Sequence, residues 1–152
     1  MIPPEEPILD KHQVSRLLFE PHMAQGGRLH RKKVFQFQEK AGSRKESVVW
    51  REVAKSSEAV HELGRSKATA DNIENPQRGI SYLGFLTAEV AAVRAIQGVE
   101  GHSFEVAHFP SEGRHHAHIE METGTGAPNR QFRNAIKVLL VELFEEMGLI
   151  AA

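Results

Sequence analysis

Cysteine is absent from this chain of 152 residues. Without a thiol, the protein has no disulfide bridge, no thiolate zinc ligand and no cysteine nucleophile. An excess of one charge is also absent, because 19 Lys and Arg residues balance 20 Asp and Glu residues to a net charge of -1. Wholesale binding to nucleic acid or to an anionic membrane is therefore not expected, although a local charged patch is compatible with this balance.

Long apolar runs are missing too. None approaches the ~20 residues that cross a bilayer, and residues 1–7 lack the basic and apolar regions of a secretory signal. We therefore expect a cytoplasmic protein with no membrane partner. Hydrophobic residues still make up 40% of the chain, which is enough for one compact core. We expect residues 1–10, rich in proline and acid, to form a flexible N-terminal arm ahead of a single globular domain at residues 11–152.

Several segments have the patterns of strands. Phe35 and Phe37 alternate with Val34, Gln36 and Gln38, as in a half-buried strand. Segments 103–109 and 114–122 flank a turn and predict a hairpin. The short apolar segments 14–19 and 47–50 predict two further strands, and 79–83 predicts a brief strand or turn.

Three segments predict helices. Ser57 is placed to cap a short helix that ends near Leu63, with Gly64 as its stop, and the polar stretch 64–79 shows no periodicity. Thr87 is placed to cap a well-buried helix that stops at Gly98, and a wide apolar stripe predicts a final helix at about 129–147. The mixed order of elements predicts an α+β fold, a largely antiparallel sheet with these two main helices packed on one face.

Histidines are concentrated in the second strand of the hairpin. Side chains alternate between the two faces of a strand, so His116, His118 and Glu120 are expected to share the outer face. His115 is expected on the inner face, with the core. Two histidines at i and i+2 and a nearby carboxylate form a set that can ligate a divalent, zinc-like metal. The alternatives are an ordinary solvated face, contact with a small anion or a partner chain, or proton transfer by one histidine.

A second candidate site lies where the glycine-containing loop 124–126 leads into the final helix. Arg130 and Arg133 sit in the first turns of that helix. A helix N-terminus attracts anions, and these two arginines oppose the helix dipole unless an anion binds between them. The alternative is that both are ordinary surface residues with partners elsewhere in the fold. The loop has no nucleotide-binding motif.

The strongest basic run contains Arg28, Arg31, Lys32 and Lys33. Such a run is typical of a patch for nucleic acid or for an acidic partner, and its alternative is a solvated face diluted by neighbouring acids.

No complete catalytic motif is present, and none of the serines lies in a nucleophile signature. We weigh three hypotheses: a non-enzymatic binding or interaction module that docks on a larger protein or on a second copy, a metal-dependent hydrolase, and a phosphate or nucleic-acid binder. We favour the first, because size, charge balance and the missing motif all agree with it.

Overall fold

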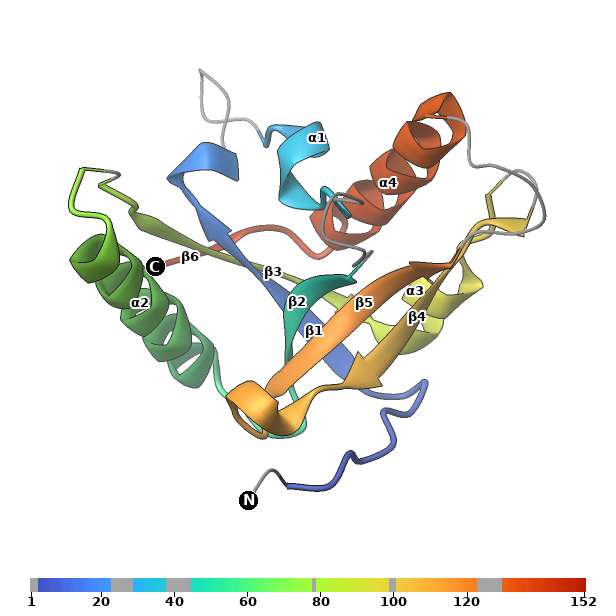
Figure 1. Ribbon diagram of the computed structural model, residues 1–152. Helices are drawn as coiled ribbons and strands as arrows, with labels where there is room; N and C mark the ends of the chain where they lie inside the picture. Colours follow the sequence, from blue (N-terminus) through green and yellow to red (C-terminus); the bar gives the residue numbers. More distant parts are fainter. Residues whose placement is uncertain (1–2, 23–28, 38–44, 78, 99–100, 123–129) are drawn as a thin grey trace.

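A six-stranded antiparallel sheet forms the centre of the molecule in a computed structural model that describes residues 3–22, 29–37, 45–77, 79–98, 101–122 and 130–152 (Figure 1). The strand order is β4-β5-β2-β1-β3-β6. The strands are β1 (Gln13–Phe19), β2 (Lys45–Trp50), β3 (Tyr82–Glu89), β4 (Ser103–His108), β5 (His116–Glu122) and β6 (Ile150–Ala151). The predicted α+β class with an antiparallel sheet is confirmed.

Helices cover both faces of the sheet. They are α1 (Arg31–Val34), α2 (Ser57–Glu74), α3 (Val90–Ala95) and α4 (Arg130–Glu145), with 3-10 turns η1 (Glu20–His22) and η3 (Pro110–Glu112). Leu18 and Leu86 join a core that includes residues of α3 and α4. Their neighbours Leu17 and Phe85 pack instead against α2. Since adjacent strand residues point to opposite faces, α3 and α4 share one face as predicted, and α2 covers the other.

Helix α2 corrects the prediction for residues 57–79. Ser56, not Ser57, is the N-cap, and its side chain accepts a hydrogen bond from the Ala59 N–H at 3.1 Å. The helix continues through Gly64 to Glu74. Gly64 does not end the helix, and a Cβ at this position would lie 2.2 Å from the ring of Tyr82. Glycine therefore allows α2 to approach β3 closely.

Two further predictions are wrong. Thr87 belongs to β3, where its hydroxyl lies 2.8 Å from that of Ser15, and the helix that follows starts only at Val90. Residues 34–37 form no strand: α1 ends at Val34, and Val34, Phe35 and Phe37 are all buried. Consecutive burial of Val34 and Phe35 is incompatible with a strand that has one wet face.

The β4–β5 hairpin forms as predicted, with its two strands antiparallel. Phe104 pairs with Met121 and Val106 pairs with Ile119. These four side chains lie in the main core, which leaves His116, His118 and Glu120 on the opposite, outer face.

The segment before β1 contacts the sheet within its described part. Ile8 is buried in the core, and Glu6 forms an ion pair with Arg114 at 2.8 Å. The flexibility of residues 1–10 stays a prediction.

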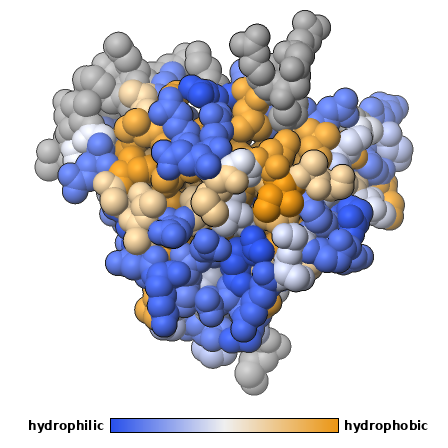
Figure 2. Space-filling view, turned by 180° about the vertical axis from the view of Figure 1, so that it is seen from behind, coloured by the Kyte–Doolittle hydropathy of each residue, from blue (hydrophilic) through white to orange (hydrophobic). Residues whose placement is uncertain are grey.

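The molecular surface mixes polar and apolar regions. Seen from behind, apolar side chains gather in the upper half of the molecule and hydrophilic ones dominate below (Figure 2). Exposed large apolar residues include Leu139 of α4 and Met147, Leu149 and Ile150 near the chain's end. Among the described residues, none of the helices combines the length and apolar composition that a membrane span requires.

Candidate functional site

The sheet opens between its two central strands. β1 and β2 pair only at Val14–Trp50 and Ser15–Val49, whereas β1 pairs with β3 along its whole length. A cavity of about 680 Å³ lies where β1 and β2 separate. Residues of β1, β2, α1, α2, η1 and the turn before β5 line it, so the cavity collects side chains from distant parts of the sequence.

Arg16 bridges the gap between the two strands. Its guanidinium donates hydrogen bonds to the carbonyl oxygens of Val34 at 3.0 Å and Ser47 at 2.8 Å, and it pairs with Glu46 at 3.2 Å. The Arg16 and Glu46 side chains are only 13% and 18% exposed. Burial lowers the pKa of Arg16, and the charge of Glu46 partly opposes that effect. An arginine remains protonated in proteins, so Arg16 places a fixed positive charge in the cavity wall.

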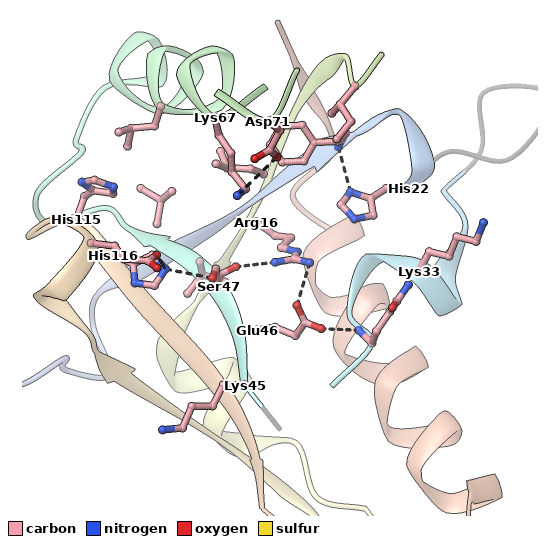
Figure 3. A pocket seen from close by; sticks show the side chains of 18 residues that line it. Arg16, His22, Lys33, Lys45, Glu46, Ser47, Lys67, Asp71, His115 and His116 are labelled. Atoms are coloured by element: carbon pink, nitrogen blue, oxygen red, sulfur yellow. Dashed lines mark hydrogen bonds and ion pairs between the residues drawn. The ribbon is translucent and has the colours of Figure 1, made fainter. Parts of the chain in front are cut away.

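Three lysines surround the same cavity (Figure 3). They are Lys33 of α1, Lys45 of β2 and Lys67 of α2. Lys67 has Asp71 at 3.8 Å, while Lys33 and Lys45 form no ion pair with any residue that the structure describes. The carboxylates around the cavity are Glu46, Asp71 and Glu112. Among the described lining residues, four basic side chains therefore stand against three carboxylates, an excess of one positive charge when every histidine is neutral.

His116 and Ser47 meet at one end of the cavity. The Nε2 atom of His116 lies 3.1 Å from Ser47 Oγ and 3.3 Å from a carboxylate oxygen of Glu112. The Nδ1 atom lies 3.1 Å from the Phe109 carbonyl oxygen. A carbonyl only accepts, so Nδ1 carries a proton, and in the neutral ring Nε2 accepts the Ser47 hydroxyl. His116 is nearly buried, whereas Ser47 is exposed.

The other histidines near the cavity favour their neutral forms. Burial, followed by the charge of Arg16, lowers the pKa of His22 to about 4. Burial, followed by the neighbouring His116, also lowers the pKa values of His115 and His118. His115 was expected on the core face, but it lies in the turn before β5 and lines the cavity with His116. The strand alternation does not apply there, because β5 begins only at His116.

The predicted metal set does not come together as a ligand group. Within the described residues, no cluster of three or more histidine and carboxylate side chains is placed to hold a metal ion, and this includes His116, His118 and Glu120. Both ring nitrogens of His116 already face protein partners. The His118 ring stacks on Phe109 with 4.5 Å between centroids. Glu120 pairs across the sheet with Glu105 and Lys45 as backbone neighbours.

The predicted anion site at the start of α4 cannot be compared with the structure. The loop 124–126 lies outside the described residues, and the side chains of Arg130 and Arg133 do as well.

The basic run is divided in the structure. Arg28 and the side chain of Lys32 lie outside the described residues. Arg31 pairs with Glu142 at 3.2 Å and with Glu145 at 3.0 Å, so its charge is directed at the C-terminal end of α4. Lys33 is exposed and is one of the residues that line the cavity.

Comparisons of the chain with protein-family models, curated proteins and solved structures find no match. Sequence reasoning missed Arg16, Ser47 and Lys67. A signal existed only for Arg16, a lone charge inside the apolar segment 14–19.

Proposed function

We propose that this protein is a binding module that holds a small organic anion in the cavity between β1 and β2. The observation that carries the proposal is the excess of one fixed positive charge among the described residues that line a cavity of about 680 Å³. Cavities of roughly 300–1,000 Å³ are the usual size for small ligands, and a few placed polar groups orient the ligand. Carboxylate and phosphate groups are the anions that lysine and arginine bind best.

The surroundings of the cations support this choice. Arg16 is held by its own hydrogen bonds, so it contributes its electric field and needs no reorganisation when a ligand enters. Lys45 and Lys67 project from different elements, β2 and α2, and they lie on either side of Ser47 in the close view (Figure 3).

Docking on a larger protein stays a prediction. A metal-dependent hydrolase lacks a ligand group among the described residues. Phosphate binding at Arg130 and Arg133 stays a prediction, because those side chains lie outside the described residues.

Thermal unfolding with citrate or inorganic phosphate, at constant ionic strength, tests the proposal. At ten times Kd, a ligand stabilises the native state by about 1.4 kcal/mol, which corresponds to roughly 3–6 °C in Tm for a chain of this size. The doubly substituted variant Lys45→Gln/Lys67→Gln should lose most of that rise. Lys55→Gln removes an exposed lysine that does not line the cavity and serves as the matched control. A Tm that is unchanged by either anion, or an equal rise in the double variant, would contradict the proposal.

A further inference from the structure

The contact between Ser47 and His116 has the geometry of a nucleophile and its base. A serine becomes nucleophilic when a base lies within about 2.6–3.2 Å of its hydroxyl and a third group orients that base. The Ser47–His116 distance is 3.1 Å, and the Phe109 carbonyl orients the ring through Nδ1. We propose that Ser47 and His116 form a nucleophile–base pair that hydrolyses carboxylic esters bound in the cavity.

The access of the two groups suits these roles. Ser47 is exposed on the outer face of β2 and lines the cavity, so an ester can approach its hydroxyl. His116 is only 8% exposed, and its ring packs against those of Phe109 and His118. The nucleophile is therefore accessible, while the base is held in one orientation and partly shielded from water.

Fixed charges favour the separation of charge that the reaction creates. The imidazolium that forms on His116 would lie 3.3 Å from the Glu112 carboxylate, which stabilises its positive charge. The guanidinium of Arg16 donates to the Ser47 carbonyl oxygen at 2.8 Å and so places a positive charge close to the backbone of the nucleophile.

The reaction has two steps. Ser47 Oγ bonds to the ester carbonyl carbon as its proton passes to His116 Nε2, and the carbon–oxygen bond to the alcohol then breaks while the alcohol takes that proton. In the second step, water attacks the acyl-serine and gives a proton to Nε2. The bond to Ser47 Oγ then breaks, and Oγ recovers the proton from Nε2. Ester and water become acid and alcohol, with no other reactant.

Release of p-nitrophenolate from p-nitrophenyl acetate, with mass-spectrometric mapping of the acetylated peptide, tests the pair. The full chain should carry acetyl on Ser47, and Ser47→Ala should lose this adduct and at least ~100-fold in rate. His116→Gln should cause a similar loss. Because His116 is nearly buried, circular dichroism must show that this variant folds. Ser47→Ala changes an exposed residue and keeps the test decisive if the histidine variant does not fold.

Two matched controls separate the pair from general surface reactivity. Ser66→Ala removes an exposed serine of α2, and His30→Gln removes a partly exposed histidine that does not line the cavity. Both should react like the wild type. Acetylation at another residue, or a wild-type rate in Ser47→Ala, would overturn the inference. Citrate or phosphate should raise the Tm of Ser47→Ala whether or not Ser47 proves to be the nucleophile. The proposed binding function is therefore judged separately.

Discussion

Arg16 on β1 and Ser47 on β2 are joined by a hydrogen bond of 2.8 Å from the guanidinium to the backbone carbonyl. The contact lies beyond the last backbone pair between these strands, Ser15 with Val49. The side chain therefore replaces the missing ladder hydrogen bonds and holds the two walls of the cavity at a fixed separation. The same contact places a positive charge next to Ser47. Among the described residues, Ser47 is the only serine whose hydroxyl contacts His116.

Replacement of Arg16 should destabilise the fold strongly. Arg16→Met leaves the poorly exposed carboxylate of Glu46 without its cation, and breaking such a pair costs about 3–5 kcal/mol. Arg16→Met/Glu46→Gln should be less destabilised than the single variant, because no unpaired buried charge remains. Urea denaturation at pH 7 measures both free energies of unfolding. A loss below ~1 kcal/mol in Arg16→Met would show that the bridge is not structural.

His22 should make stability depend on pH below neutrality. Its Nδ1 accepts the Phe19 N–H at 3.0 Å, and burial, followed by the charge of Arg16, lowers the pKa to about 4 from 6.5. Between these two values the unfolded chain binds a proton that the folded protein does not. The free energy of unfolding should therefore fall as the pH drops from 6.5 to 4.

The loss attributable to His22 should be roughly 1–2 kcal/mol, since each pKa unit corresponds to about 1.4 kcal/mol and solvent reaches part of the ring. His115 and His118, whose pKa values burial also lowers, change stability in the same direction. Denaturant titrations across this pH range should show that the free energy of unfolding changes less steeply with pH for His22→Gln than for the wild type. Identical slopes would mean that His22 does not titrate as described.

Gly64 tests the packing of α2 on the sheet. Alanine favours a helix interior over glycine by about 1 kcal/mol, yet a Cβ here would lie 2.2 Å from the Tyr82 ring. Gly64→Ala should therefore destabilise the protein by about 1–3 kcal/mol through overpacking. In the Tyr82→Ala background the same substitution should become stabilising. Thermal or urea denaturation of the wild type, the two single variants and the double variant gives the coupling free energy between positions 64 and 82. Equal effects of Gly64→Ala in both backgrounds would refute the proposed contact.

The β4–β5 hairpin could be predicted because its pattern is strong. Phe104 and Val106 alternate with polar residues, as do Ile119 and Met121, so only one register buries all four. The same alternation placed His116 and His118 on the outer face correctly.

Helix α2 could not be predicted beyond Leu63 because its buried stripe is short and weakly apolar. It consists of Val60, His61, Gly64 and Ala68. The close packing of this helix on Tyr82, rather than hydrophobic burial, sets its position on the sheet. Such close packing leaves no periodic pattern in the sequence. Lys67 was missed with it.

The candidate site depends on long-range pairing. β2 lies between β5 and β1, which brings Ser47 to His116 on one side and to Arg16 on the other. Local patterns predict strands but not their order in a sheet. The sequence therefore pointed to His116 and its neighbours as a metal set. The groups that contact His116 in the structure are Ser47, Glu112 and Phe109, and the strand order and the adjacent turn bring them there.

The central claim is that the cavity between β1 and β2 binds an anion. Titration of the 15N-labelled protein with citrate, at constant ionic strength and followed by NMR, tests it most directly. The account predicts saturable shifts of the amide signals of Ser47, Lys67 and His116, with weaker shifts in Lys45→Gln/Lys67→Gln. Signals that stay unmoved in this region, or shifts confined to residues outside the cavity lining, would contradict it.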